Sequence, residues 1–286
     1  MSGCNVVSQT VLWIGKYGAR VVSGFCALAV VLLLVAPLIW TLETSFHPTR
    51  VIYSISPHLW PWPVALGNYH EVLGGSGLFG DLVNSVIITA VSVGGVVVLS
   101  IGTGYGLSKV RWGGAVAGGL LVFMVVPWVI YLLPIFLAEL ALGMLGTYQA
   151  VIVPYIALNV PLGVLIMWRG FRVVPREIVE AARLDGAGEV VCCVVESRIA
   201  KGSIAAVVIV TFIQVWAEFL FAETLLQSST VETLAVGIIN VVQRDQALAF
   251  GPISAASVVL LVPAIGIFLV LQRAFERGML EGAVKG

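Results

Sequence analysis

Six long runs of uncharged residues divide the chain. They cover Val21–Leu42, Leu82–Ser108, Trp112–Ala138, Leu140–Trp168, Gly202–Ala217 and Gln246–Gln272, and the fifth resumes after Glu218 as Phe219–Ala222. A helix needs about 20 apolar residues to cross a hydrocarbon core of about 30 Å. Because backbone groups in lipid must bond within their own segment, we expect each run to be a helix. The pattern predicts an all-α integral membrane protein with six transmembrane helices.

Composition supports this class of protein. Of the 286 residues, 59% are hydrophobic and 10% are charged, and the mean hydropathy is +1.06. Soluble domains carry about 25% charged residues, so a soluble enzyme is excluded, and a disordered chain needs high polarity. Fifteen basic and fifteen acidic residues cancel, so no bulk charge favours nucleic acid as a partner.

The basic residues predict an orientation. If the N-terminus is cytoplasmic, every lysine and arginine except Arg50 and Arg244 falls on the cytoplasmic side. Positive charge is retained inside, so we expect a multi-pass protein of the plasma membrane with both termini cytoplasmic. The first run is interpreted as an uncleaved helix. The chain then divides into a cytoplasmic N-terminal segment (1–20), a six-helix domain (21–275) and a cytoplasmic tail (276–286).

The loop between the fourth and fifth runs, residues 170–201, has its own structure. Strong helix formers fill Arg176–Leu184, Asp185-Gly186 is typical of a turn, and helical composition resumes over Ala187–Arg198. Joining two spans needs only a handful of residues, so we expect a helix–turn–helix that docks to a cytoplasmic partner. The alternative is an amphipathic helix on lipid. The acidic residues disfavour it because the cytoplasmic leaflet is negative; they are Glu177, Glu180, Asp185 and Glu189.

Histidines and cysteines predict no metal site. His47, His58 and His70 share one outer segment but lack a close ligand spacing. The adjacent Cys192 and Cys193 have no second pair or nearby histidine. We therefore expect no metal, no cofactor and no disulfide.

Small residues suggest where helices approach closely. Gly102 and Gly106 lie four apart in the second run, and Gly114 and Gly118 do so in the third. Such pairs let two helix backbones pack together in a membrane. We expect a packed bundle with these glycines at its contacts.

At the loop, the sequence resembles a known family. Glu180-Ala181-Ala182 followed by Asp185-Gly186-Ala187 is similar to the EAA loop of ABC-importer permeases, and specifically to the second permease subunit of the carbohydrate-uptake, maltose-permease type. Further similarities occur in the family's order at Asn84-Ser85, Tyr105–Ser108, Met124–Pro127, Phe171-Arg172, Pro175, Trp216–Leu220 and Gly278. The last is followed by Gly282–Gly286, which resembles the family's GAVKG ending.

The resemblance implies a non-catalytic subunit of a larger machine. It would pair with a homologous second permease, two ATPase subunits and an extracytoplasmic solute-binding protein, within a lipid bilayer. The solute would be a sugar or sugar-like molecule, such as an oligosaccharide, a polyol or a glycerophosphodiester. The residues implied to couple to the ATPase are Glu180, Ala181, Ala182, Asp185, Gly186 and Ala187. The tail implied to face the ATPase comprises Gly282, Ala283, Val284, Lys285 and Gly286, although a frayed terminus is an equal alternative.

The chain also departs from the family. Family prolines that follow the EAA segment are replaced by Ile199 and Ser203, and a common asparagine by Ala217. These changes bear on the geometry at the start of the fifth span and on the strength of coupling.

Polar groups in the spans are candidates for a substrate path. Carboxylates within a span are costly and usually face the bundle or a water path, and sugars need hydrogen-bond acceptors and aromatic faces. The candidates are Asn159, Gln214, Trp216, Glu218 and Glu223. For Glu218, the alternative to contact with substrate is a structural role. For Glu223, the alternative is a position at the membrane boundary.

Two other functions fit the sequence less well. An ion-coupled secondary transporter typically contains repeated halves and broken helices, and the sequence has no internal repeat. A membrane-embedded enzyme needs a nucleophile or metal set within the spans, and neither GxSxG nor HExxH occurs. No GxxxxGK[ST] is present either, so ATP would have to be bound by a partner.

Overall fold

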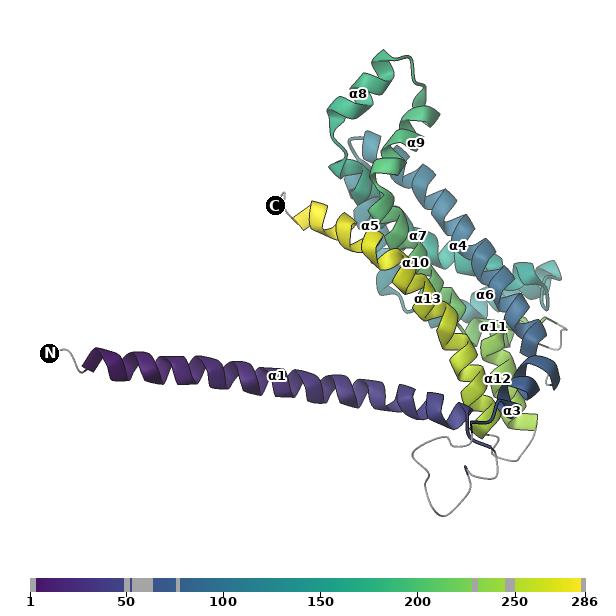
Figure 1. Cartoon of the computed structure of the whole chain (residues 1–286). Helices are drawn as coiled ribbons and strands as arrows, with labels where there is room; N and C mark the ends of the chain where they lie inside the picture. Colours follow the sequence, from purple (N-terminus) through teal and green to yellow (C-terminus); the bar gives the residue numbers. More distant parts are fainter. Residues whose placement is uncertain are drawn as a thin grey trace. The chain divides into compact units, whose positions relative to one another are not determined.

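The computed structural model describes residues 4–48, 52, 64–75, 78–227, 231–244 and 250–283. Over these residues the chain is helical and contains no strand, which confirms the all-α prediction. The longer helices are α1 (Cys4–Ser45), α4 (Leu78–Lys109), α5 (Gly113–Val125), α7 (Tyr148–Val173), α10 (Lys201–Trp216) and α13 (Phe250–Ala283) (Figure 1). Shorter ones are α3 (Gly67–His70), η1 (Glu71–Gly75), η2 (Trp128–Tyr131), α6 (Leu132–Leu142), α8 (Arg176–Leu184), α9 (Glu189–Ile199), α11 (Leu220–Leu225) and α12 (Leu234–Arg244).

The chain forms two compact units. One comprises residues 1–69 and 249–258, and the other residues 70–248 and 259–286. In the first, Asn68 Nδ2 donates to the carbonyl oxygens of Ser45 and His47, each at 2.9 Å. The Ser45 and Tyr69 hydroxyls lie 2.8 Å apart. These bonds hold the end of α1, and the two residues that follow it, against α3.

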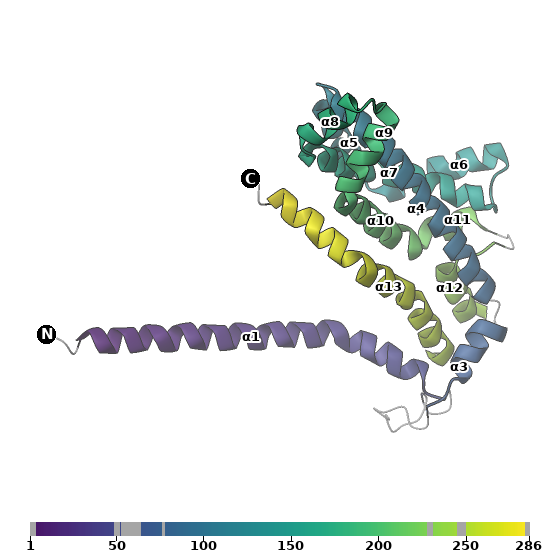
Figure 2. The same cartoon turned by 45° about the horizontal axis from the view of Figure 1, so that its top comes forward.

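The second unit is built on α4 and α7, with α10 packed against both (Figure 2). Glycines make the contact of α4 with α7 close. A Cβ on Gly104 would lie 2.7 Å from Cβ of Met167, and one on Gly163 would lie 2.2 Å from Oγ of Ser100. Backbones can approach this closely only where side chains are absent.

Within the described chain, most of the glycines chosen from spacing do not lie at helix contacts. An added Cβ at Gly102, Gly106 or Gly118 would meet nothing within 4 Å, and only Gly114 has a neighbour, Trp168 at 3.7 Å. Spacing identifies glycines that share a helix face, but it does not identify which face meets the neighbouring helix.

Four helices are long and apolar enough to cross a membrane: Val22–Ser45, Leu78–Lys109, Tyr148–Val173 and Phe250–Arg273. Two pairs of helices also qualify together but are bent, α5 with η2–α6 by 83° and α9 with α10 by 77°. The described chain therefore has four candidate spans, or up to six if each bent pair is one span.

Two span boundaries differ from the sequence-based expectation. The third run is not one straight helix: Val126 is extended with ψ 121°, and Pro127, which lacks an N–H, follows it. The fourth span begins at Tyr148 rather than Leu140, because α6 continues to Leu142. A turn with left-handed glycines, Gly143 (φ 66°) and Gly146 (φ 77°), joins the two helices.

Candidate functional site

The loop between the fourth and fifth spans is a helical hairpin. α8 starts directly after Pro175, whose fixed φ and missing N–H suit a helix start. It ends at Leu184, Asp185 follows as the cap, and Gly186 adopts φ 86°, a region that glycine enters at little cost. The Ala187 N–H then donates to the Ala182 carbonyl oxygen at 3.0 Å. The helix–turn–helix expected over residues 176–198 is present, with α9 starting at Glu189.

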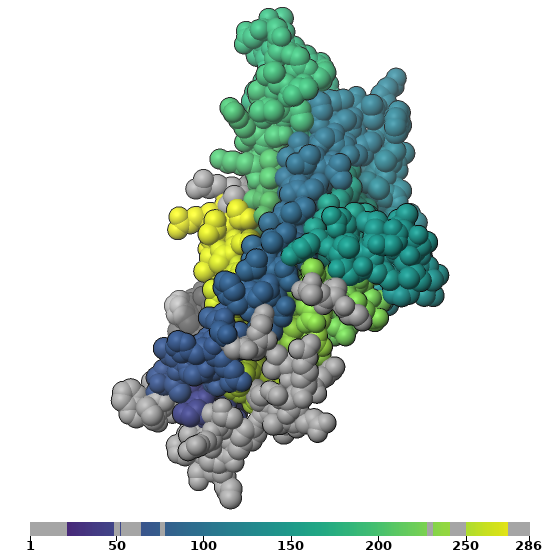
Figure 3. Space-filling model, turned by 90° about the vertical axis from the view of Figure 1, so that its right-hand side faces the viewer, coloured from purple at the N-terminus to yellow at the C-terminus, as the bar shows by residue number. Residues whose placement is uncertain are grey.

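The six expected coupling residues lie together around this turn. Glu180, Ala181, Asp185 and Gly186 are exposed, while Ala182 and Ala187 are half-buried. Val179, by contrast, is buried and anchors α8 to the core beneath it. Figure 3 shows the hairpin (green) at one end of the second unit, beyond the helices that carry it.

Two exposed apolar residues at the tip of the hairpin were not predicted to be functional from the sequence. Leu184 is 89% exposed at the end of α8, and Val190 of α9 is 79% exposed. Leu184 lies outside every candidate span. Val190 belongs to the bent pair of α9 and α10 and not to a span made of one helix. The sequence does carry a signal for Leu184, because this residue follows four polar or small residues. The exposure of Leu184 and Val190 at the tip leaves both side chains accessible to a partner.

Three polar contacts hold the hairpin in shape and attach it to α4. Arg183 Nη2 donates to Glu189 Oε1 at 2.7 Å and links α8 to α9. The Tyr105 hydroxyl donates to Glu189 Oε2 at 2.6 Å, and Lys109 Nζ pairs with Glu196 Oε1 at 2.5 Å. Attraction to Glu189 raises the pKa of Arg183, and the hydrogen bond from Tyr105 lowers the pKa of Glu189, so both groups stay charged at neutral pH. The hairpin is thus joined to the end of α4 at two points.

The step from α9 into α10 needs no proline. Ile199 and Ser203 stand where the family has prolines, yet the two helices bend by 77°. The bend occurs at Ala200, with ψ 22°. A Cβ on Gly170 would lie 2.3 Å from Oγ of Ser203, so α7 approaches α10 closely at this point. The replaced residues therefore leave a sharp bend in place.

Among the substrate-path candidates, Glu218 is held by internal contacts. It is 7% exposed. Its Oε2 accepts from the Tyr155 hydroxyl at 2.6 Å and from the Ala222 N–H at 3.1 Å, and its Oε1 accepts from the Phe221 N–H at 2.9 Å. The carboxylate therefore binds the free N–H groups at the start of α11, which favours the structural alternative for this residue.

The remaining candidates are spread over different surroundings. Asn159 is 4% exposed and donates to the Tyr155 carbonyl oxygen at 2.8 Å, so it joins Glu218 around Tyr155. Trp216 is 4% exposed, donates Nε1–H to the Leu260 carbonyl oxygen at 2.7 Å and stacks on Phe212. Gln214 is exposed and Glu223 is half-buried. Tyr155, which joins two candidates, was not predicted because an uncharged residue inside an apolar run gives no signal.

The remaining expectations concern the tail and metals. Gly282 and Ala283 belong to the last turn of α13, whereas Val284, Lys285 and Gly286 lie outside the described residues. Helices α1 and α13 continue without a break across the expected boundaries at 20/21 and 275/276.

Within the described part of the chain, no three His, Cys, Asp or Glu residues are grouped so that they could hold a metal ion.

Comparisons with known proteins agree with the resemblance seen in the sequence. Residues 96–281 match the family described as "Binding-protein-dependent transport system inner membrane component". The trehalose transport system permease protein SugB of Mycobacterium tuberculosis is 29% identical over 87% of this chain and 92% of its own length. The sulfoquinovosyl glycerol transport system permease protein SmoH of Agrobacterium fabrum is 29% identical over 87% of this chain and 88% of its own length.

A solved structure shares the fold. A chain from a bacterial ABC transporter involved in the import of the acidic polysaccharide alginate superimposes with a TM-score of 0.78 and 18% identity, over 91% of this chain and 98% of that chain. The resemblance to sugar ABC-importer permeases is therefore confirmed, and the fold is that of an ABC-importer permease.

Proposed function

The chain belongs to the family of binding-protein-dependent transport system inner membrane components, and on that premise we propose that it couples ATP hydrolysis in a partner to import of a sugar or sugar-like solute. It is a multi-pass membrane permease subunit of an ABC importer, and not itself an enzyme. Relatives named for trehalose and for melibiose, raffinose and stachyose support a carbohydrate as the solute.

The observation that carries the proposal is the attachment of the hairpin to α4. A driving subunit that moves α8 displaces α4 only if the connection is stiff. The Lys109–Glu196 pair and the Tyr105–Glu189 bond supply that stiffness at the base of the hairpin. The exposed tip, with Glu180 and Leu184, supplies the docking surface. Coupling then follows because the partner contacts the hairpin differently in its two nucleotide states.

The partners follow from the same role. Two ATPase subunits dock from the cytoplasm, one on this hairpin and one on that of a homologous second permease, and a solute-binding protein delivers the solute from outside. This arrangement requires the hairpin and both termini to be cytoplasmic, as the distribution of basic residues also favours. The tail Gly282–Gly286 then lies on the ATPase side.

A substrate path would run along polar groups of the spans. Gln214 is the strongest of the candidates because its side chain is exposed and no hydrogen bond to another described residue occupies it. Asn159 and Trp216 are buried within this chain, so their contact with solute would require a second state of the bundle. Glu223, half-buried in α11 beyond the end of α10, would lie toward the outer end of the path.

Uptake by the assembled importer tests the proposal. The chain is reconstituted with its companion permease and ATPase in liposomes, together with the binding protein, and uptake of labelled trehalose and raffinose is measured. Uptake that requires ATP and survives an uncoupler is expected. Uptake that persists without ATP and collapses with the ion gradient would instead identify an ion-coupled secondary transporter.

A further inference from the structure

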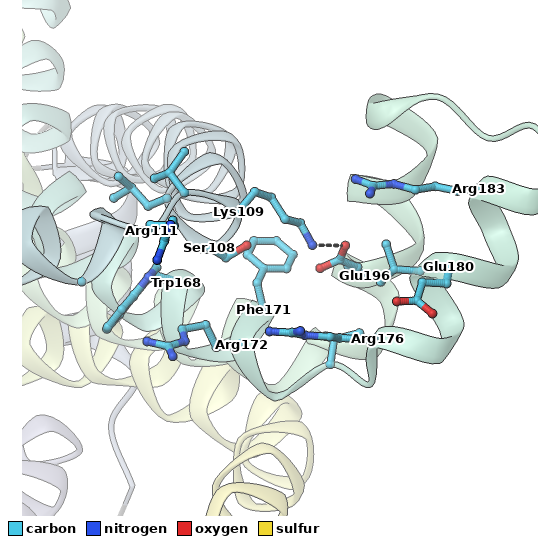
Figure 4. Close-up of a pocket in the computed structure, with 15 residues that line it drawn as sticks. Ser108, Lys109, Arg111, Trp168, Phe171, Arg172, Arg176, Glu180, Arg183 and Glu196 are labelled. Carbon is cyan, nitrogen blue, oxygen red and sulfur yellow. Dashed lines mark hydrogen bonds and ion pairs between the residues drawn. The ribbon is translucent and has the colours of Figure 1, made fainter.

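A cavity of about 540 Å³ lies between the hairpin and the ends of two spans (Figure 4). Its walls come from the end of α4, the turn into α5, the end of α7, and both helices of the hairpin. Five basic side chains line it against two acidic ones. The basic ones are Lys109, Arg111, Arg172, Arg176 and Arg183, and the acidic ones are Glu180 and Glu196.

Three of the five cations have no ion-pair partner in the described chain. Lys109 pairs with Glu196, and Arg183 pairs with Glu189 outside the cavity lining. Arg111, Arg172 and Arg176 make no ion pair with any described residue, and the Arg172 guanidinium lies 5.2 Å from the centre of the Trp168 ring. In Figure 4, Arg176 extends from α8 in the direction of Arg172. The cavity therefore keeps an excess of positive charge.

Its position adds a second constraint. The candidate spans α4 and α7 end at Lys109 and Val173, directly beside the cavity. Where these helix ends mark the edge of the membrane, the cavity lies at the level where a bilayer gives way to water, and Trp168 suits that level. Lipid phosphates occupy the same depth, and soluble phosphate esters reach it from the cytoplasm.

We propose that this cavity binds a phosphate-ester anion through Arg172 and Arg176, with Arg111 at its rim. A guanidinium fork pairs with two oxygens of a phosphate, and a phosphate group offers enough oxygens for more than one fork. A single carboxylate does not. Glu180, the lining acid without a basic partner among the described residues, borders the site and disfavours ligands of higher negative charge. A ligand bound here contacts α7 and α8 together, so it favours the hairpin position in which this cavity is open.

The test uses the purified full chain in nanodiscs. In discs of phosphatidylcholine alone, inorganic phosphate and glycerol 3-phosphate are titrated, and binding is followed by calorimetry and by tryptophan fluorescence. In discs with equal phosphatidylglycerol and phosphatidylcholine, native mass spectrometry measures which lipid stays bound. The variants are Arg172→Gln and Arg176→Gln. The matched control is Arg198→Gln, because Arg198 is an exposed arginine of the same hairpin that does not line the cavity.

The site predicts saturable binding that each cavity variant weakens about tenfold, the loss of one charge-assisted contact, while Arg198→Gln binds as the unaltered chain does. Response to glycerol 3-phosphate identifies a soluble ester as the ligand, and selective retention of phosphatidylglycerol identifies a lipid headgroup. If a cavity variant fails to fold, Arg111→Gln at the exposed turn replaces it. Absence of binding by both probes, or equal weakening by Arg198→Gln, overturns the proposal, even if the hairpin still docks to an ATPase.

Discussion

Lys109, at the last turn of α4, forms an ion pair with Glu196 of α9 across 87 positions of sequence. Glu196 is 1% exposed, whereas the Lys109 side chain is 33% exposed. The pair therefore joins a transmembrane helix to the loop beneath it through a carboxylate that is almost fully buried. It gives the hairpin a fixed position relative to α4, which a flexible loop would lack.

Removing Lys109 should destabilise the chain more than removing both partners. Lys109→Met leaves the Glu196 carboxylate buried and unpaired, and we expect a loss of about 2 kcal/mol in unfolding free energy, below the cost for a fully buried pair because Lys109 is partly exposed. In Lys109→Met/Glu196→Met that penalty is relieved. Thermal unfolding in detergent measures both, with Lys201→Met as an exposed control. Equal losses in the single and double variants would contradict this account of the pair.

Gly186 should tolerate substitutions according to backbone conformation rather than size. A Cβ there meets nothing within 4 Å, but φ is 86°. Asparagine enters this region more readily than a β-branched residue. We expect Gly186→Val to cost about 1–2 kcal/mol and to reduce co-purification of the ATPase, while Gly186→Asn keeps most of it.

The control for this prediction is Gly188→Val. Gly188 also has open space around an added Cβ, but its φ is −73°. If Gly188→Val weakens ATPase binding as much as Gly186→Val does, side-chain bulk at the tip, and not the backbone of the turn, is responsible.

Glu218 should behave as a structural residue. Glu218→Ala leaves the Tyr155 hydroxyl and the Phe221 and Ala222 N–H groups without their acceptor, and we expect a loss of about 3 kcal/mol in unfolding free energy. Exposed Gln214 provides the contrast: Gln214→Ala should leave stability within about 0.5 kcal/mol and raise the KM for solute. Thermal unfolding together with uptake kinetics separates the two. An unchanged melting temperature with a raised KM in Glu218→Ala would return this residue to the substrate path.

Glu180 should matter for coupling and not for folding. Its side chain is exposed, so Glu180→Lys is expected to leave the melting temperature unchanged and to abolish the stimulation of ATP hydrolysis by solute-loaded binding protein. Glu177→Lys makes the same charge change on the same exposed helix outside the EAA segment. Normal stimulation in Glu180→Lys, or its loss in both variants, would contradict the coupling role.

Much of the fold could be predicted from hydropathy because a bilayer imposes length and polarity directly on the chain. The helical hairpin was equally accessible, since Pro175, the helix formers after it and Asp185-Gly186 act locally. The bend at Val126-Pro127 was not found. Counting apolar residues ignores backbone conformation, although Pro127 was a visible signal for it.

Long-range contacts explain what the sequence did not reveal about the site. Tyr155 and Glu218 lie 63 positions apart, and Tyr105 and Glu189 lie 84 apart. Nothing in either local pattern indicates its partner. Glu218 was therefore interpreted from its cost in a membrane, whereas its contacts show how that cost is met. Leu184 is different, because the four polar or small residues before it already indicate an exposed position.

Contact between the hairpin tip and the ATPase is the central claim. A photo-crosslinking amino acid at Leu184, which is 89% exposed, reports on it in the assembled importer, and the same probe at Val98, 70% exposed within the α4 span, is the control. We predict cross-links from position 184 to the ATPase subunit that change in yield when ATP is added, and cross-links from position 98 to lipid or the second permease only. Cross-linking of position 184 to lipid alone, with or without ATP, would contradict the account.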